Sequence, residues 1–546
     1  MFNPMKTSRL LLSLTALMLS LALNLSAQDS PKTAYMVADA HLDTQWNWDI
    51  QTTIREYIPK TIRQNLHLLR TYPDYIFNFE GAIKYSWMKE YYPTEYEEVK
   101  KYIAQGRWHL AGTSWDANET VIVSPESWLR NALLGQTFYR TEYGQESTDV
   151  MLPDCFGFSY TLPTLAAHCG LIGFSSQKLG WRNNDFYEGA LRRYPFSVGL
   201  WQGIDGSRIM MAHGYGYGQR YADSDLSENR RLLREMNEST VPMGYRYYGT
   251  GDTGGSPDIP SVRAVMSGMK GSGPVTIVSA TSDQLYKQFL PFSAHPELPV
   301  FDGELLMDVH GTGCYSSQAA MKLYNRQNEH LADAAERASV VSEWLGRAAY
   351  PSARITDGWH RVVLHQFHDD LPGTSIPRAY EFSWNDELIA LSQFSSVLTN
   401  AVSGVASQMN TEVSGTPVIL HNTEAFAQQT VADVVMPGGA NIAYTVTGPD
   451  GKRVASQMFT DSRGTAHLLF DANVPGVGFA VYGAKGAGSP KAFAERDVTE
   501  VANSVYSLRF DANGDICSLI DKRTGRELVR QGEAIGLVVF DDCRSE

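Results

Sequence analysis

Apolar runs alternate with longer amphipathic stretches along the first half of the chain. The runs "AYMVADA" at 34–40, "TDVML" at 148–152 and "YRYYG" at 245–249 are typical of buried strands. Segments such as "EYEEVKKYIAQG" at 95–106 have the spacing of surface helices. Strands that alternate with helices predict a parallel sheet covered by helices, so we expect an α/β fold over residues 28–295.

The pattern changes twice in the second half. From about 316 to 409 proline and glycine thin out, and long helical stretches flank the loop "HDDLPGTSIP", which predicts a helical bundle. After residue 414, short alternating runs such as "TPVILHN" and "GFAVYGA" stand between glycine-rich turns and are typical of a β-sandwich. A chain of 546 residues is too long for one core, so we expect domains at 28–295, 296–410 and 411–546.

The first 27 residues have the pattern of a secretory signal peptide. Lys6 and Arg9 precede an apolar stretch at 10–23, and "LSAQDS" follows it, so we expect cleavage after Ala27. The apolar stretch is shorter than the roughly 20 residues that a membrane span needs, and we find no later segment of that kind. We therefore expect a periplasmic or secreted protein that is not inserted in a membrane after cleavage.

Composition excludes one class of partner. The net charge is −14 and no basic cluster is present, which argues against binding to nucleic acid. Eleven tryptophans and 28 tyrosines would suit sugar stacking, although aromatic side chains more often serve a core. The sequence leaves open whether the chain forms a homo-oligomer.

Polar side chains follow three of the apolar runs. His41 and Asp43 come after the first run, and residues two apart in a strand point to the same side, so the two can converge. An imidazole and a carboxylate suit a divalent metal, which usually needs three or four ligands. Asp154 and Asp252 follow the other two runs, and the carboxyl ends of parallel strands meet at one edge of a sheet.

Each of these residues also has a plain structural interpretation when taken alone. Asp154 suits a helix cap, and Asp252 suits a turn between glycines. His365 and His368 could share a helical face, and either could be the missing nitrogen ligand. Trp46 suits a core as well as a stacking platform for a sugar ring.

Four ordered motifs resemble a known family. "AHLDTQW", "MLPDCFGFS", "GTGDTGGSP" and "LHQFHDDLPGTS" are similar to the signature blocks of glycoside hydrolase family 38, the class II α-mannosidases. The resemblance implies a seven-stranded (β/α) barrel, a three-helix bundle and β-sandwich domains. It also implies that one Zn²⁺, or another divalent metal, is bound by four residues: His41, Asp43, Asp154 and His368.

The resemblance implies catalytic and sugar-binding roles as well. Asp154 would also be the nucleophile and Asp252 the general acid/base of a retaining mechanism, in which two carboxyls lie about 5 to 5.5 Å apart. A metal next to Asp154 favours the charged carboxylate, whereas Asp252, away from the metal, can keep its proton. The residues implied to contact the mannose ring are Trp46, Phe156 and Asp369.

The chain departs from the family pattern at a few positions. Phe367 stands where some members have a second histidine, so His365 is not counted as a ligand. Phe158, Val309 and His310 also differ from frequent family residues, which leaves the leaving-group subsite and the linkage preference open. The stretch 503–529 is similar to the opening strands of the family's large C-terminal β domain, so we expect that the chain ends before that domain is complete.

We therefore expect an exported zinc-dependent α-mannosidase that acts on terminal α-mannosyl linkages of N-glycans or mannan fragments. One alternative is a catalytically weak or silent homologue that binds glycans without turnover. A second is a zinc-dependent polysaccharide deacetylase, because His/Asp pairs at strand ends also suit a metal-activated water.

Overall fold

The computed structural model describes residues 32–539, apart from 181–193, 195, 215, 240, 308–310, 437–438, 440 and 490–497. The predicted signal peptide and the pair Val309 and His310 lie outside the described residues. The chain divides into two compact units, residues 1–409 and 410–546.

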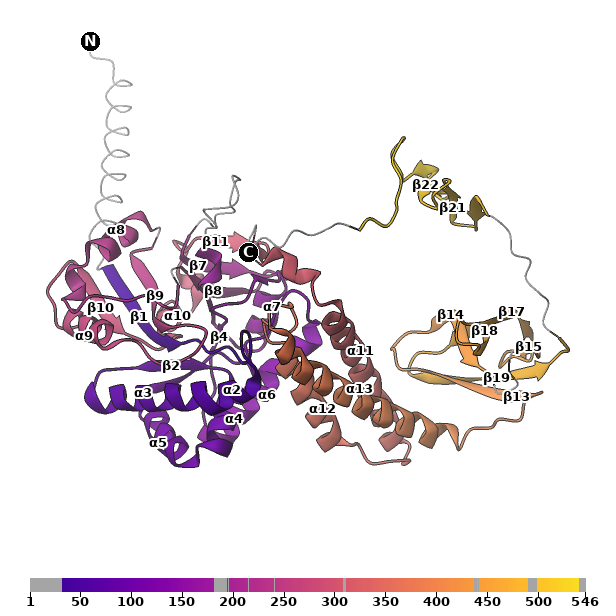
Figure 1. Ribbon diagram of the computed structural model, residues 1–546, viewed down its shortest axis with the longest axis horizontal. Helices are drawn as coiled ribbons and strands as arrows, with labels where there is room; N and C mark the ends of the chain where they lie inside the picture. The colour runs from indigo at the N-terminus through magenta and orange to yellow at the C-terminus, as the bar shows by residue number, and fades with distance from the viewer. Residues whose placement is uncertain are drawn as a thin grey trace, which may run out of the picture. The chain divides into compact units, whose positions relative to one another are not determined.

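Ten strands of the N-terminal unit form two five-stranded sheets (Figure 1). In the first sheet every pairing is parallel, and β1 pairs with three neighbours. The first sheet contains β10 (Val275–Ser279), β1 (Lys32–Ala40), β2 (Phe77–Glu80), β3 (Trp108–Ala111) and β9 (Met243–Thr250). The second sheet contains β11 (Val300–Asp302), β7 (Val198–Gln202), β8 (Arg208–His213), β6 (Gly173–Ser176) and β4 (Asp149–Met151). Only β7 and β8 pair antiparallel within it.

The predicted α/β fold is confirmed by these sheets and by the helices between their strands. The pairing divides the described strands between two sheets, so it does not confirm a closed seven-stranded barrel. Strand β5 (Gly157–Phe158), just after Asp154 in the chain, pairs antiparallel with the distant β12 (Leu305–Leu306).

Strand β1 is buried on both faces, as its continuous apolar run predicts for a parallel sheet. Ala34, Met36 and Ala38 belong to one core cluster, whereas Tyr35 and Val37 point into another. This double burial fixes the register of the strand, because a shift by one residue would exchange the two faces. The carboxyl end of β1 therefore delivers the next residues to a defined position.

Helices connect the strands and cover the sheets. They are α2 (Ile50–Thr52), α3 (Ile58–Thr71), α4 (Ala82–Tyr91), α5 (Pro93–Ala104), α6 (Pro125–Tyr143), α7 (Leu162–His168), α8 (Arg230–Glu238), α9 (Ile259–Gly268) and α10 (Gln284–Gln288). Helix α6 starts where the Ser124 side chain accepts a hydrogen bond from the Ser127 amide, and it ends at Gly144 in the left-handed conformation. Asn131 on α6 accepts from the backbone N–H of Asp116 and donates to the backbone carbonyl of Asp116. The helix thereby fixes the loop that follows β3.

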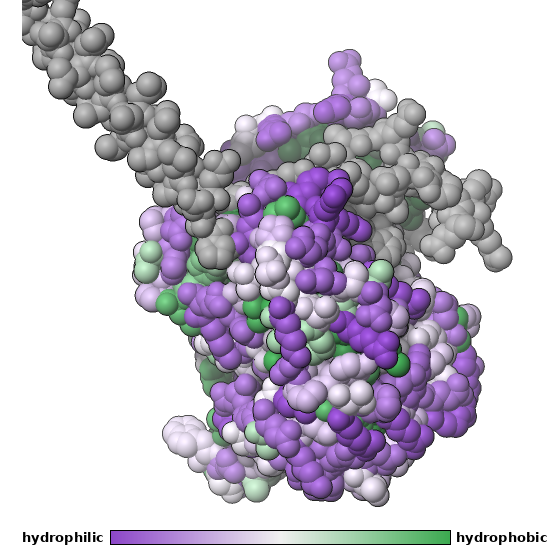
Figure 2. All heavy atoms as spheres, turned by 90° about the vertical axis from the view of Figure 1, so that its left-hand side faces the viewer, coloured by the Kyte–Doolittle hydropathy of each residue, from purple (hydrophilic) through white to green (hydrophobic). Residues whose placement is uncertain are grey.

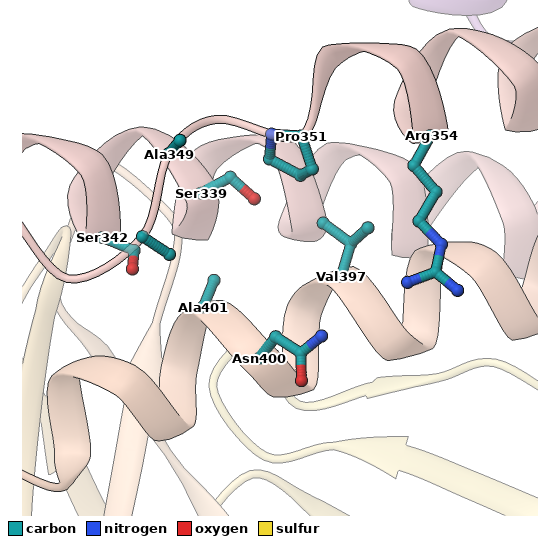
Figure 3. A pocket seen from close by; sticks show the side chains of 9 residues that line it. Ser339, Ser342, Ala349, Pro351, Arg354, Val397, Asn400 and Ala401 are labelled. Atoms are coloured by element: carbon teal, nitrogen blue, oxygen red, sulfur yellow. The ribbon is translucent and has the colours of Figure 1, made fainter.

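Three long helices follow the sheets and pack against one another: α11 (Ala319–Trp344), α12 (Ser352–His365) and α13 (Pro377–Ala406). A cavity of about 150 Å³ lies between them, and Ser339, Arg354, Val397 and Asn400 are part of its lining (Figure 3). It contains none of the predicted site residues. The loop 366–376 between α12 and α13 carries His368 and Asp369.

The expectation that no segment after residue 27 could span a membrane is wrong for helix α13. By length and composition it is apolar enough to cross a membrane, although we found no such segment after residue 27. Its packing explains the composition, because Ala390, Phe394 and Val397 are buried against the neighbouring helices. Glu387 on the same helix is also buried and accepts a hydrogen bond from the Asn328 side chain. The buried residues lie along one face of α13, and 28% of its apolar window is buried.

The C-terminal unit consists of strands in antiparallel sheets. One sheet has the order β13 (Thr416–Asn422), β19 (Gly478–Gly486), β15 (Tyr444–Thr447) and β16 (Arg453–Val454). Another has the order β14 (Gln428–Val435), β18 (Ala466–Val474) and β17 (Ser456–Thr460). Alternate side chains of β18 are buried, and both sheets contribute to one core. A third sheet contains β20 (Glu500–Ala502), β21 (Tyr506–Phe510), β22 (Ile516–Asp521) and β23 (Arg526–Glu527).

The face of the N-terminal unit that lies on the left in Figure 1 is mostly hydrophilic (Figure 2). Its apolar residues form small separate groups, and the described residues show no broad apolar patch on that face. This distribution agrees with the acidic composition.

Two helical glycines provide a test of the packing. A Cβ at Gly135 on α6 would lie 2.2 Å from the carbonyl oxygen of Thr113, whereas a Cβ at Gly404 on α13 would have no neighbour closer than 3.5 Å. We expect Gly135→Ala to lower the free energy of unfolding by about 1–3 kcal/mol through overpacking. Gly404→Ala should raise it by about 0.5–1 kcal/mol, because alanine favours a helix more than glycine does. Chemical denaturation measures both, and equal stabilities of the two variants would contradict the close approach of α6 to the loop.

Candidate metal centre and active site

Four side chains converge where strand ends of both sheets meet the loop after α12. His41 and Asp43 follow β1, Asp154 follows β4, and His368 lies in the loop 366–376. One ligand atom from each lies within 4.8 Å of the other three, and all four residues are buried. His41 Nε2 is 3.0 Å and His368 Nε2 is 3.3 Å from Asp43 Oδ1, and His368 Nε2 is 3.8 Å from Asp154 Oδ2. The structure therefore brings together the four ligands that the family resemblance implies.

The atoms at the centre of this cluster lack ordinary partners. His41 Nε2, Asp43 Oδ1 and His368 Nε2 are buried and accept or donate no hydrogen bond within the described part of the chain. A buried polar atom without a partner costs about 1–3 kcal/mol. Two imidazole nitrogens and two carboxylates form a donor set that Zn²⁺ and other divalent ions accept. The residues present therefore fit a metal.

The electrostatics of the cluster favour positive charge at its centre. Burial disfavours charged imidazoles, yet Asp43 and Glu80 raise the pKa of His41, and Asp369 and Asp43 raise the pKa of His368. Burial also disfavours a carboxylate, yet the two histidines hold the pKa of Asp43 well below its usual range. A divalent cation would balance the negative charge of these carboxylates and leave the histidine ligands unprotonated.

Hydrogen bonds on the outer side of each histidine orient the rings. His41 Nδ1 donates to Glu80 Oε1 at 2.6 Å, and His368 Nδ1 donates to the carbonyl of Ala117 at 3.1 Å. With Nδ1 protonated in both rings, each Nε2 presents its lone pair to the centre. Sequence reasoning missed Glu80, although it ends the apolar strand β2 and so meets the strand-end criterion that identified Asp154.

Asp154 is held by two residues that sequence reasoning also missed. Its Oδ1 accepts from Gln177 Nε2 at 2.7 Å and lies 3.0 Å from Lys178 Nζ. Lys178 is buried, and its Nζ lies 5.1 Å from the centroid of the Phe156 ring. Both residues follow β6, where a strand-end search would have found them. They leave Asp154 Oδ2 facing the metal cluster.

Asp252 lies outside the metal cluster and has a different partner. Its Oδ1 accepts a hydrogen bond from the Tyr217 hydroxyl at 2.6 Å. Its backbone has a φ of 56°, an uncommon value for a residue with a side chain, and its carbonyl accepts from the amide of Asp43 at 2.8 Å. Burial raises the pKa of Tyr217, and the charges of Asp154 and Asp252 raise it further. Tyr217 thus lies near both carboxylates, and the segment "HGYGYGQR" carried no signal for it.

The three predicted sugar-contacting residues lie at or near the cluster. The Phe156 ring centroid is 6.1 Å from that of His368, and Asp369 Oδ2 is 3.8 Å from His368 Nε2. Burial raises the pKa of Asp369 to about 8, and its Oδ1 accepts a hydrogen bond from the Thr374 hydroxyl. Trp46 is partly exposed three residues beyond Asp43, and its carbonyl accepts from the amide of Ile376 at 2.8 Å.

His365 is not among the converging residues. Its Nδ1 lies 2.9 Å from Asp370 Oδ2 and its Nε2 lies 3.3 Å from Asp386 Oδ2, so both nitrogens are already paired. Asp370 also accepts two hydrogen bonds from the Gln45 side chain, at 2.8 and 2.9 Å. His365 therefore links α12 and α13 to the loop that carries the metal ligands.

The paired state of His365 predicts a pH-dependent contribution to stability. Burial disfavours the charged ring, but hydrogen bonds to Asp370 and Asp386 outweigh it and raise the pKa of His365 to about 10. In the unfolded chain a histidine has a pKa of about 6.5. Because the folded pKa is the higher one, the contribution is complete below about pH 6.5 and is lost as the pH rises through about 10.

We therefore expect the stability difference between the wild type and His365→Gln to be largest near pH 6. It should shrink by about 2–5 kcal/mol by pH 10. Urea denaturation at several pH values measures it. His360→Gln on the same helix is the control: burial lowers the pKa of His360, so its stability difference should be constant above about pH 7. A constant difference for His365→Gln would contradict the charged state of the ring.

Two family descriptions match the chain. Residues 31–303, half of its length, match the N-terminal domain of glycosyl hydrolases family 38, and residues 310–403 match the alpha mannosidase middle domain. The described four-ligand cluster takes three ligands from the first region and His368 from the second.

Relatives and solved structures agree with this assignment. The chain is 28% identical to alpha-mannosidase G of Dictyostelium discoideum over 546 residues, which cover 94% of this chain and 49% of the relative. It is 32% identical to the alpha-mannosidase of Saccharomyces cerevisiae over 366 residues, which cover 64% of this chain and 32% of the relative. The chain thus spans about half the length, or less, of these curated relatives.

The fold is similar to the crystal structure of an alpha-mannosidase from Enterococcus faecalis, with a TM-score of 0.71 and 17% identity over 91% of this chain and 61% of that chain. At this identity the structural likeness concerns the fold alone. The sequence matches carry the assignment: the chain belongs to glycoside hydrolase family 38.

Proposed function

We propose that this chain is a metal-dependent α-mannosidase that hydrolyses terminal α-mannosyl linkages of N-glycans or mannan-derived oligosaccharides. The observation that carries the proposal is the convergence of His41, Asp43, Asp154 and His368 on one buried point with unsatisfied ligand atoms. The names of the relatives support the substrate class. Export through the signal peptide at 1–27, zinc as the metal and the full barrel, bundle and sandwich architecture are parts of the same proposal.

The residues around the centre suit a retaining mechanism. Gln177 and Lys178 orient the Asp154 carboxylate, which attacks the anomeric carbon. Asp252, held by the Tyr217 hydroxyl and outside the metal cluster, protonates the leaving oxygen and then takes a proton from the attacking water. A divalent metal held by the four ligands would supply Lewis-acid polarisation of the two cis hydroxyls of mannose.

The sugar itself would be held by residues beside the two carboxylates. The Asp369 carboxyl lies beside His368 and can hydrogen-bond a sugar hydroxyl, and the Phe156 ring next to His368 can contact the sugar. Trp46 is partly exposed and offers an apolar face to the ring. Burial of His41, Asp43 and His368 keeps bulk water from the ligands.

The alternatives are less well supported. A polysaccharide deacetylase would use the metal cluster but gives no role to the pair of Asp252 and Tyr217. A glycan-binding homologue without turnover would keep every contact described above, and only an activity measurement separates it from the enzyme.

The first test concerns the metal. We expect about one zinc per chain in the purified protein, and we expect His41→Ala and His368→Ala each to lose most of it. His421→Ala in the C-terminal unit, where the ring stacks on Phe479, is the control and should keep the metal. Elemental analysis of the folded proteins measures the content. Full retention in both ligand variants would rule out the assignment.

The second test separates the two carboxylates with aryl α-mannosides. Asp154→Asn should abolish turnover on every substrate, because the nucleophile is lost. Asp252→Ala should retain activity on substrates with good leaving groups, which need little protonation, and azide should partly restore its rate. Product analysis by NMR should show a retained anomeric configuration. Inverted product, or equal losses in both variants on all substrates, would contradict the assigned roles.

A further inference from the structure

A fully buried ion pair lies behind the metal cluster. Lys84, in the first turn of α4, places its Nζ 3.0 Å from Asp116 Oδ1 in the loop after β3, and both side chains have 0% exposure. Neither residue belongs to the four-ligand cluster or to the catalytic pair. A buried ion pair is often no more stabilising than an apolar pair of the same volume, so stability alone does not explain its presence.

The Asp116 carboxylate connects two segments that carry metal ligands. Its Oδ2 accepts a hydrogen bond from the hydroxyl of Thr44, the residue after Asp43. Its Oδ1 accepts from the amide of Ala117 at 2.8 Å, which fixes the orientation of that segment. The carbonyl of Ala117 in turn accepts from both the amide and the Nδ1 of His368, each at 3.1 Å. Asp116 therefore touches neither ligand and constrains both.

Lys84 is placed to hold Asp116 and to neutralise a second carboxylate. Glu80, at the end of β2 just before α4, accepts a hydrogen bond from Nδ1 on the outer side of His41. Burial lowers the pKa of Lys84, but Asp116 and Glu80 outweigh that effect and raise it, so the ammonium form persists. Gly81 makes the approach feasible, because a Cβ there would lie 2.9 Å from Lys84 Nζ.

The charges near the cluster support a role for this lysine. Buried carboxylates surround the centre, among them Asp43, Asp154, Asp369, Glu80 and Asp116. Two buried lysines, Lys84 and Lys178, face them.

We propose that Lys84 and Asp116 act as a positioning pair, which holds the Thr44 and Ala117 segments so that Asp43 and His368 point at one metal ion. The inference rests on the proposed function, because it requires a metal at the cluster. It adds that residues without any contact to the metal or the sugar set the affinity and geometry of the site.

The direction in which Lys84→Met changes metal affinity distinguishes a positioning role from a simple charge effect. Lys84→Met removes a positive charge near the site, so if only the electric field mattered, affinity for a divalent cation would rise. If Lys84 positions Asp116, the freed carboxylate no longer holds the Thr44 and Ala117 segments, and affinity falls. Changes in the outer layer of metal sites typically cost about 10–100-fold in affinity.

The experiment measures zinc affinity by chelator competition in the full chain, and the absorption spectrum of the cobalt-substituted protein. We expect Lys84→Met to bind zinc at least about tenfold more weakly than the wild type and to shift the cobalt ligand-field bands. Arg246→Met is the matched control, because Arg246 also forms a buried ion pair, with Glu235 of α8 at 2.9 Å. It should leave affinity and spectrum unchanged.

A double variant keeps the test decisive if Lys84→Met alone folds poorly. Lys84→Met with Asp116→Asn removes both charges of the ion pair together and keeps an oxygen that can accept from Ala117. If the two residues act as a pair, adding Lys84→Met to Asp116→Asn changes zinc affinity much less than about tenfold.

The outcomes distinguish this inference from the proposed function. A wild type that binds no divalent metal would overturn both. A wild type that binds zinc, with Lys84→Met binding it equally or more tightly, or with independent effects of the two substitutions, would overturn the positioning pair alone.

Discussion

The arrangement of the N-terminal unit depends on one constraint, which is the burial of several carboxylates around a single point. Two carboxylates and two imidazoles within 4.8 Å of one another would be unfavourable in a dry interior without compensating charge. The chain supplies part of that compensation with Lys84 and Lys178. The carboxylates that these lysines do not neutralise raise the pKa of His41 and His368. A divalent cation is the simplest group that balances their charge and binds all the unsatisfied ligand atoms together.

Backbone hydrogen bonds turn the distant segments into one rigid frame. The amide of His41 donates to the carbonyl of Thr250 at 3.0 Å, and the amide of Asp43 donates to the carbonyl of Asp252 at 2.8 Å. The metal-binding segment and the segment of the general acid/base candidate are therefore parts of the same structure. On the other side, the amide of His368 donates to Ala117. Residues some 330 positions apart can thus hold the sub-ångström geometry that a catalytic site requires.

The sequence predicted the site better than it predicted the architecture around it. Polar residues after apolar runs mark strand ends, and this rule placed His41, Asp43, Asp154 and Asp252 at one edge because the carboxyl ends of parallel strands meet there. The same rule would have found Glu80 and Gln177. It does not reach Tyr217 or the pair of Lys84 and Asp116, whose partners are decided by packing between segments.

Other expectations failed for identifiable physical reasons. The three-residue spacing of His365 and His368 suggested one helical face, but α12 ends at His365, and the chain turns so that the two rings face different partners. Strand pairing could not be read from apolar runs, since runs that are buried on both faces look alike whichever neighbour they pair with. For the same reason the apolar face of α13, which is buried in the helical segment, could be assigned only after the helices were seen together.

Buried charge of this kind links metal binding to folding. The unfolded chain has no preformed ligand set, so any metal that binds the native cluster stabilises the fold in proportion to its affinity and concentration. Glu80, Lys84 and Asp116, which surround the ligands, affect the free energy of folding in both states. They must be desolvated whether or not a metal is present. Their desolvation lowers the stability of the metal-free protein. The ligand geometry that they are proposed to hold increases stability only when a metal is bound. Stability of the metal-free state alone would favour apolar side chains in place of Lys84 and Asp116, so the proposed positioning role accounts for the ion pair better than stability does.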